Sequence, residues 1–391
     1  MKITFYSNFL NHHQLPFCLS MYEKLGDDFK FVATEKVPKE RLDLGYHDMN
    51  KEYPFVITTY DSNENKQIAE CMSIDSDVII IGSAPEKYAI ERLKRNKLTF
   101  RYSERIFKRG RWRILDPRVW ISLYNVHVKY RNKNLYMLCA SGYTASDFAI
   151  IGAYKNKAYK WGYFPQVIDY DLEKLFDKKK NHTLQILWCA RFMKWKHPEK
   201  VIEVAIKLNK ENYNYKINMI GIGELEGEIA KLVKDNSLEE RVSLLGSMAP
   251  EKVREYMENA NIFLFTSDYN EGWGAVLNES MNSGCAVLAS HAIGSVPFLL
   301  KHEQNGLIYK NGDISDLHLQ VKRLLDDENL QVKLGEQAYN TLNTTWNARN
   351  AVDSFLKLVD CIINNKENTI LEGPCSNADV IPQEKMYKHL I

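Results

Sequence analysis

Strand-like runs alternate with helix-length segments over nearly all of the 391 residues, and this alternation limits the possible folds more than any other feature. Repeated strand–helix–strand units place their strands in parallel, because each helix carries the chain back to the same edge of the sheet. We therefore predict an α/β fold with doubly wound parallel sheets.

The predicted strands fall into two groups, and a chain of this length accommodates two domains of ordinary size. The first group comprises Lys2–Ser7, Phe29–Ala33, Phe55–Thr58, Asp77–Ile81, Leu98–Tyr102 and Leu135–Ala140, and the second comprises Gln185–Ala190, Lys216–Ile220, Arg241–Leu245, Ile262–Phe265 and Cys285–Ala289. The predicted parts are an N-terminal domain over 1–165, a charged linker over 166–182, a C-terminal domain over 183–345, a helix over 346–365 and a loosely ordered tail over 366–391.

Composition excludes several classes of protein. Hydrophobic residues make up 45% and charged residues 26% of the chain, the formal net charge is only +2, and no apolar run approaches the length of a membrane span. Seven cysteines without a CxxC pair argue against a disulfide framework or a zinc site. The N-terminus alternates like a strand and lacks the apolar core of a signal peptide, so we expect a cytoplasmic protein.

The segment Thr266–Ser290 carries the strongest functional pattern. Glu271 follows a predicted strand, two glycines come next, and a helix-like run then carries Glu279. Glycines ahead of a helix let backbone N–H groups approach an anion, and carboxylates bind hydroxyl groups. This combination predicts a site for a sugar diphosphate; an ordinary strand–helix–strand unit with solvated glutamates is the alternative.

A pair of cations lies after the first strand of the second group. Arg191 and Lys196 are five residues apart on one turn, where they can neutralise a pyrophosphate without a metal ion. A solvated basic loop ahead of an ordinary helix is the alternative.

Several ordered elements over Gln185–Tyr309 match a known pattern. These are Arg191-x4-Lys196, Gly221-x-Gly223, Leu244-Leu-Gly246, Glu271-x7-Glu279, Gly294-Ser-Val-Pro297 and Asn305-Gly306. In these elements the chain resembles retaining family 4 glycosyltransferases of the GT-B fold, of the type that builds bacterial capsule and lipopolysaccharide.

The resemblance implies two Rossmann-like domains facing each other across a cleft, with the helix over 346–365 crossing back to the first. It implies a metal-independent enzyme that retains anomeric configuration, uses a UDP- or GDP-linked sugar and needs no further cofactor. Glu279 would bind the ribose, Glu271 the transferred sugar, and Arg191 and Lys196 the diphosphate. The remaining donor-binding residues would be Gly223, Gly246, Ser247, Met248, Gly272, Trp273, Gly274, Ala275 and Val276.

The acceptor would be a lipid-linked saccharide of a surface polymer, bound by the N-terminal domain. His12 and His13 precede a predicted helix and are candidates for contacting the sugar or accepting the acceptor's proton, unless they merely cap that helix. Many relatives place a histidine after the strand that corresponds to Leu98–Tyr102. Glu104 stands there instead and is the candidate substitute.

The region 91–134 is strongly basic, with 14 Lys and Arg against three acids and with aromatic residues between them. This mixture suits an anionic membrane surface and predicts a peripheral membrane protein. A solvated basic face is the alternative, and we do not expect a nucleic-acid partner.

Other functions are compatible with the same motifs. A GT-B epimerase or phosphorylase would use a related site, and a non-catalytic nucleotide-sugar sensor or scaffold would need only its binding residues. Because Arg191, Lys196, Glu271 and Glu279 are all present, an active transferase is favoured.

Overall fold

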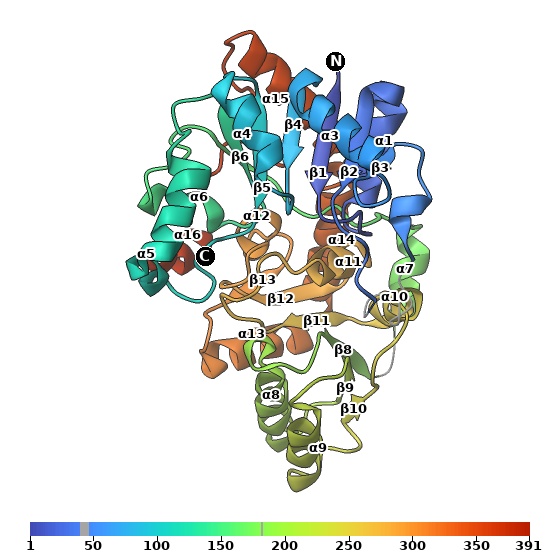
Figure 1. Cartoon of the computed structure of the whole chain (residues 1–391). Coiled ribbons are helices and arrows are strands. Elements are labelled where there is room, and N and C mark those ends of the chain that lie inside the picture. The colour runs from blue at the N-terminus through green and yellow to red at the C-terminus, as the bar shows by residue number, and fades with distance from the viewer. Residues whose placement is uncertain (40–46, 181–182) are drawn as a thin grey trace. The chain divides into compact units, whose positions relative to one another are not determined.

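The computed structural model describes residues 1–39, 47–180 and 183–391, which form two compact units (Figure 1). Unit 1 comprises Met1–Gln166 and Asn347–Ile381, and unit 2 comprises Val167–Trp346 and Pro382–Ile391. Each unit is built on a parallel sheet of its own, which confirms the predicted α/β class with two doubly wound sheets.

Unit 1 contains a seven-stranded sheet in the order β3-β2-β1-β4-β5-β6-β7, in which each neighbouring pair is parallel. Its strands are β1 (Ile3–Ser7), β2 (Phe29–Ala33), β3 (Val56–Thr58), β4 (Val78–Ile81), β5 (Thr99–Ser103), β6 (Leu135–Cys139) and β7 (Ala158–Lys160). Its helices are α1 (Leu15–Leu25), α3 (Asn63–Asp75), α4 (Lys87–Lys94), α5 (Pro117–Leu123), α6 (Thr144–Ile150) and α15 (Ala348–Ile363).

Unit 2 contains a six-stranded parallel sheet in the order β10-β9-β8-β11-β12-β13. Its strands are β8 (Leu184–Cys189), β9 (Tyr215–Ile220), β10 (Val242–Leu244), β11 (Ile262–Phe265), β12 (Ala286–Ser290) and β13 (Leu307–Tyr309). Its helices are α7 (Leu172–Lys178), α8 (Pro198–Lys210), α9 (Glu226–Asp235), α10 (Pro250–Asn259), α11 (Val276–Asn282), α12 (Val296–Leu299), α13 (Ile314–Asp326), α14 (Glu328–Thr344) and α16 (Gln383–Leu390).

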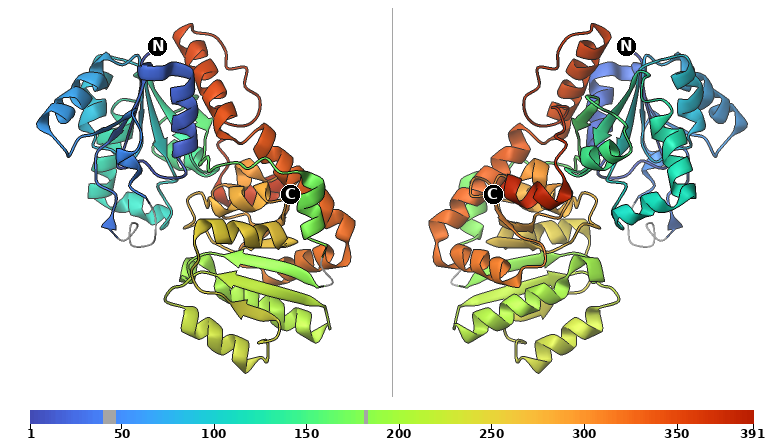
Figure 2. Two further views of the ribbon diagram at one scale, coloured as in Figure 1. Left: turned by 90° about the vertical axis from the view of Figure 1, so that its right-hand side faces the viewer. Right: turned by 90° about the vertical axis from the view of Figure 1, so that its left-hand side faces the viewer.

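Helices cover both faces of the unit 2 sheet (Figure 2). Apolar side chains of α8, α9 and α13 pack with those of the strands into one buried core. The order of the strands reverses between β8 and β11, and doubly wound sheets bind ligands beside the carboxyl ends of the strands at such a reversal. The loops that follow β8 and β11 are therefore the expected place for a ligand of unit 2.

The helix expected over 346–365 is α15, and it belongs to unit 1. Its residue Phe355 is buried against three aromatic rings, with centroid distances of 6.5 Å to Phe17, 5.0 Å to Phe100 and 5.9 Å to Trp161. These edge-on contacts make α15 part of the unit 1 core.

The charged stretch predicted as part of a linker is largely helical. Asp171 caps helix α7 by accepting a hydrogen bond from the N–H of Lys174 at 3.3 Å, and Leu175 is buried. The buried ammonium of Lys179 donates to the carbonyls of Met257 and Ala260, at 2.9 and 2.7 Å. The prediction of a linker rested on the charge of this stretch, but these contacts attach the stretch to unit 2. Its last positions, 181–182, lie outside the described residues.

The tail over 366–391 is not loosely ordered. Lys160 donates its N–H to the carbonyl of Ser376 and accepts from the N–H of Cys375, both at 2.7 Å, so the tail pairs with the edge of β7. Farther on, α16 buries Met386 in unit 2. The polar composition of the tail hides these contacts, because most of them use the backbone.

The basic region contains a run of short helical turns rather than one long helix. A 3-10 turn over Arg111–Leu115 is followed by α5, which Asp116 caps, and by a π turn over Tyr124–Val128. Among the described residues, no helix is both long enough and apolar enough to cross a membrane.

Candidate functional site

Two loops of unit 2 meet where the strand order reverses. The loop after β8 carries Arg191 and Lys196, and the loop after β11 carries Glu271. Thr266 joins them, because its hydroxyl donates to the carbonyl of Lys196 at 2.7 Å and accepts from the indole of Trp188 at 2.9 Å. The structure therefore places the predicted cations and the predicted sugar-binding carboxylate in one neighbourhood.

Lys196 and Glu271 are in direct contact through the ammonium group and the carboxylate, and both side chains are largely buried. The hydroxyl of Ser267 donates to the same carboxylate oxygen at 2.9 Å. The ammonium also lies 4.2 Å from the ring centroid of Trp195, within cation–π range. Glu271 is thus held by a cation and a hydroxyl.

Arg191 is exposed and forms no ion pair with any residue of the described ranges. The turn after β9 packs directly on its loop: a Cβ at Gly221, where φ is +136°, would lie 1.9 Å from the carbonyl oxygen of Ala190. A side chain at Gly221 would therefore push the two turns apart.

The other predicted donor-binding residues of this edge adjoin the same turns. Gly223 packs on the backbone of Phe192, and the carbonyl of Gly246 accepts the N–H of Gly221 at 2.8 Å. Ser247 is exposed and Met248 half-buried in the segment before α10.

The predicted glycine-rich segment bends sharply before α11. Gly274 has φ +84°, and a Cβ there would lie 2.4 Å from the ring of Phe265. The indole of Trp273 is fully buried and donates to Asn278 at 2.9 Å, so this residue has only its backbone to offer a ligand. Buried Gly272 and half-buried Ala275 and Val276 complete the segment.

Glu279 lies on α11 with a half-buried side chain. Burial raises the pKa of its carboxyl group, and the positive charge of Arg254 opposes that increase. Burial also raises the pKa of Cys189 to about 12, the charge of Glu279 adds to this effect and the charge of Lys196 reduces it. The charges of Glu279 and Lys196 thus act on the same thiol, at the last residue of β8.

Arg254 is a residue of this neighbourhood that the sequence did not single out. From α10 its guanidinium donates to the carbonyl of Glu279 at 3.1 Å and to the amide oxygen of Asn282 at 3.2 Å. No sequence signal separates it from the other cations on amphipathic helices, since only the packing of α10 on α11 brings it to Glu279.

The three predicted acceptor-side residues are joined in unit 1 by a fourth. His12 and His13 have ring centroids 3.7 Å apart, and His13 stacks on Tyr163 at 5.3 Å. The hydroxyl of Tyr163 donates to Glu104 at 2.6 Å, and Glu104 also pairs with Lys108. Tyr163 was missed because it follows β7 in an irregular segment without a recognisable motif.

The chain contains two Asp-x-Asp strings, Asp75/Asp77 and Asp169/Asp171, and three of these four carboxylates make structural contacts. Asp77 accepts the N–H of Lys2 at 2.8 Å, Asp169 accepts the hydroxyl of Tyr339 at 3.0 Å, and Asp171 caps α7. The described ranges contain no group of three His, Cys, Asp or Glu side chains with the arrangement of metal ligands.

Residues 172–341 match the family model of group 1 glycosyl transferases. The chain is 28% identical over 185 residues to the amylovoran biosynthesis glycosyltransferase AmsK of Erwinia amylovora. The matched region covers 46% of this chain and 45% of AmsK. It is 29% identical over 155 residues to the N-acetylgalactosamine-N,N'-diacetylbacillosaminyl-diphospho-undecaprenol 4-alpha-N-acetylgalactosaminyltransferase of Campylobacter jejuni. That match covers 40% of this chain and 36% of the relative. The chain thus matches less than half the length of these curated relatives.

The structure of Anabaena HepE, solved in complex with UDP, superposes with a TM-score of 0.67 at 15% identity and covers 92% of this chain and all of that one. Together with the two doubly wound sheets, this similarity identifies a two-domain α/β fold of the GT-B type.

Proposed function

We propose that this chain, which is related to group 1 glycosyl transferases of the capsule and lipopolysaccharide type, transfers a sugar from a nucleotide diphosphate sugar to a saccharide acceptor. The observation that carries the proposal is the contact of Lys196 with Glu271, beside exposed Arg191, at the carboxyl ends of β8 and β11. A cation pair and a carboxylate at one sheet edge suit a ligand that combines a diphosphate with hydroxyl groups.

In this proposal the donor replaces internal contacts of the site. The diphosphate forms ion pairs with the ammonium of Lys196 and the guanidinium of Arg191. A sugar hydroxyl then donates to Glu271 in place of that ammonium. Glu279 accepts from the ribose hydroxyls. The two cations stabilise the charge that grows on the leaving diphosphate as the glycosidic bond breaks.

We further propose that the reaction retains anomeric configuration and needs no metal ion. Arg191 and Lys196 supply the positive charge that a bound divalent cation supplies elsewhere. The acceptor hydroxyl attacks the face of the sugar from which the diphosphate departs and gives its proton to that diphosphate. The new glycosidic bond thus replaces the bond to phosphate, and no side chain has to form a covalent intermediate.

The proposed acceptor is a lipid-linked saccharide of a surface polymer, bound by unit 1. The names of two relatives, one for amylovoran biosynthesis and one for a diphospho-undecaprenol substrate, support this class. His13, Tyr163 and Glu104 form a connected polar and aromatic group, which suits the hydroxyls and the apolar face of a sugar ring.

An anionic membrane surface is the proposed partner of the basic region. Exposed apolar side chains gather in one segment of it, with Trp112 68%, Leu115 81% and Ile121 58% exposed. Trp120 and Tyr124 are exposed beside them, Arg109 is exposed just before Trp112, and Arg118 is exposed between Leu115 and Trp120. Aromatic and basic residues together favour the interface of an anionic bilayer.

A thermal-shift series with UDP, GDP, ADP and CMP in the presence of EDTA tests the donor site. A ligand that binds only the folded chain adds about 2.7 kcal/mol of stability at a hundredfold excess over its dissociation constant, and the midpoint rises accordingly. We expect one nucleoside diphosphate to raise the midpoint in EDTA. The absence of any shift would contradict the donor site.

The stereochemistry has its own measurement. NMR of the product should show the same anomeric configuration as the donor sugar, and an inverted product would contradict the retaining mechanism.

A further inference from the structure

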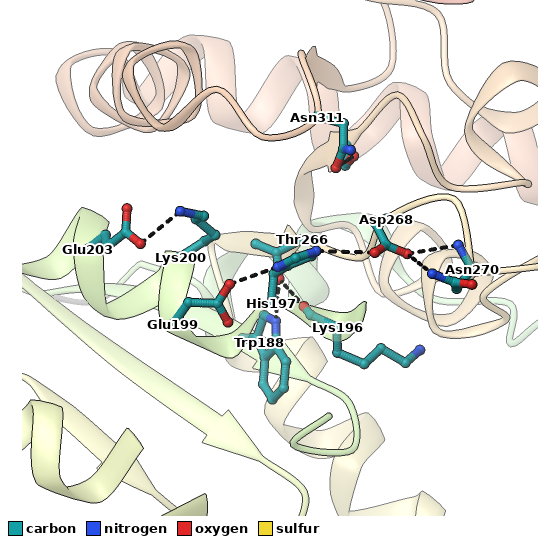
Figure 3. A network of polar contacts seen from close by, with 11 residues as sticks. Trp188, Lys196, His197, Glu199, Lys200, Glu203, Thr266, Asp268, Asn270 and Asn311 are labelled. Carbon is teal, nitrogen blue, oxygen red and sulfur yellow. Dashed lines mark hydrogen bonds and ion pairs between the residues drawn. The ribbon is translucent and has the colours of Figure 1, made fainter. Parts of the chain in front are cut away.

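His197 is a bridge between the two loops of the donor site. It follows Lys196 directly and has a left-handed backbone with φ +52°, which turns the chain from the 3-10 turn Lys194–Lys196 into α8. Its Nδ1 lies 2.7 Å from Glu199 on α8, and its Nε2 lies 3.3 Å from Asp268 in the loop after β11 (Figure 3). One imidazole thus spans two carboxylates from separate elements.

Asp268 organises the turn that presents Glu271. It accepts the N–H and the side-chain amide of Asn270, at 2.8 and 2.9 Å (Figure 3), and its carbonyl accepts the N–H of Glu271 at 3.0 Å. Its own N–H donates to the carbonyl of Trp195 at 3.0 Å. A shift of Asp268 would therefore move both Glu271 and the turn that carries Lys196.

The charges around His197 favour its protonated form. Hydrogen bonds with Asp268 first and Glu199 second raise its pKa to about 9, against burial. Other ionisable groups lie on the elements around His197. Lys194 and Lys196 belong to the 3-10 turn, and Lys200 and Glu203 of α8 form an ion pair with each other. Tyr309 of β13 is close enough to Glu199 for the charge of Glu199 to raise its pKa. Because the pKa is raised, the stability that the charged bridge contributes is full below the ordinary pKa of about 6.5 and is lost as the pH rises through about 9.

We propose that the imidazolium of His197 is a positioning residue, which holds Lys196 and Glu271 in the arrangement that a nucleotide sugar meets. This inference rests on the proposed donor site. The proposal also accounts for a histidine at position 197, where the backbone is left-handed. Glycine would adopt that backbone easily, but it has no side chain to bridge Glu199 and Asp268.

The test measures UDP affinity by calorimetry between pH 6 and pH 10 for the wild type, His197→Asn, His197→Gly and Glu199→Gln. Asparagine and glycine both tolerate the left-handed backbone, so these variants remove the imidazole without straining the turn. Each retains the other titratable groups of the site, so the difference between their profiles and that of the wild type isolates His197.

We expect wild-type affinity to fall as the pH rises through about 9. His197→Asn and His197→Gly should bind UDP roughly tenfold more weakly at neutral pH, as for the loss of one charged hydrogen bond, and should lack that fall. Glu199→Gln should shift the fall to lower pH, because one of the two carboxylates that stabilise the imidazolium is gone.

If the histidine variants keep both the affinity and the pH profile of the wild type, the inference is wrong. If the wild type itself binds neither UDP nor another nucleoside diphosphate, the proposed function fails instead. If the histidine variants change the melting temperature but leave the pH dependence of UDP affinity as in the wild type, His197 has only a structural role and the proposal is wrong.

Discussion

Lys196 and Glu271, which the proposed function assigns to the diphosphate and to the transferred sugar of the donor, are each other's partners in this structure. They come from the ends of β8 and β11, 75 residues apart in sequence. A donor must therefore break an internal ion pair as it binds, and this cost reduces the binding free energy that Lys196 contributes. Before the donor binds, the ion pair keeps both side chains in place.

Glu271→Gln tests this competition. We expect kcat to fall by a hundredfold or more, about 2.7 kcal/mol, because a neutral amide stabilises the transferring sugar less than the carboxylate. UDP should bind at least as tightly as to the wild type, since the ammonium of Lys196 is released. Calorimetry with UDP and steady-state kinetics measure the two effects, and Lys196→Met, which should weaken UDP binding, is the control. Weaker UDP binding by Glu271→Gln would contradict the competition.

Glu279→Gln addresses the ribose. Removing the charged acceptor of a ribose hydroxyl should weaken UDP binding by about 2 kcal/mol, roughly thirtyfold. The wild type should also prefer UDP to its 2′-deoxy analogue, and this preference should be smaller in the variant, whose amide oxygen still accepts a hydrogen bond but carries no charge. Calorimetry with both nucleotides decides the matter, with Glu228→Gln on the exposed face of α9 as the control. An undiminished preference in Glu279→Gln would contradict the assignment of the ribose to Glu279.

Arg105→Met should destabilise unit 1. Arg105 donates to Asp147 at 3.2 and 3.1 Å with both side chains almost fully buried, and Asp147 also accepts the N–H of Phe107 at 3.0 Å. Removing the cation leaves a buried carboxylate, which costs about 3–5 kcal/mol. Scanning calorimetry measures the loss. Arg118→Ala, which breaks the exposed pair with Asp116, should leave the melting temperature unchanged.

Replacement of Trp112, Leu115 and Ile121 by serine should reduce sedimentation with anionic vesicles. Each substitution removes exposed apolar surface that would enter the bilayer interface, while the charge of the segment stays the same. Serine at Ile222 and Leu319, two exposed apolar residues of unit 2, is the matched control. Equal sedimentation of both variants would rule out this segment as the membrane contact. Binding to anionic vesicles should weaken with salt.

The strand pattern could be predicted because it depends on local sequence. Strands β2 and β11 have the bounds predicted for them, since each is a short apolar run buried in the sheet. β7 was missed, because Ala-Tyr-Lys contains no such run and its outer edge is completed by the distant tail. A three-residue strand of this kind is defined by its neighbours rather than by its own composition.

The same distinction applies to the donor site. Placing Lys196 and Glu271 near each other requires that β8 and β11 be parallel neighbours. The strand–helix pattern predicts parallel strands but not their order, so the common site of the two residues was predicted from the family resemblance. The bridge of His197 to Asp268 and the approach of Arg254 to Glu279 depend on side-chain directions in packed loops and helices. No spacing in the sequence encodes those directions, so neither contact could be predicted.

The division of the chain into units has a consequence for biosynthesis. Phe355, which packs against Phe17, Phe100 and Trp161 of unit 1, leaves the ribosome only after the whole sheet of unit 2 has been made. Domains usually fold in the order of their synthesis. Here the core of unit 1 can be completed only after all the strands of unit 2 have been synthesised, because α15 is made after them.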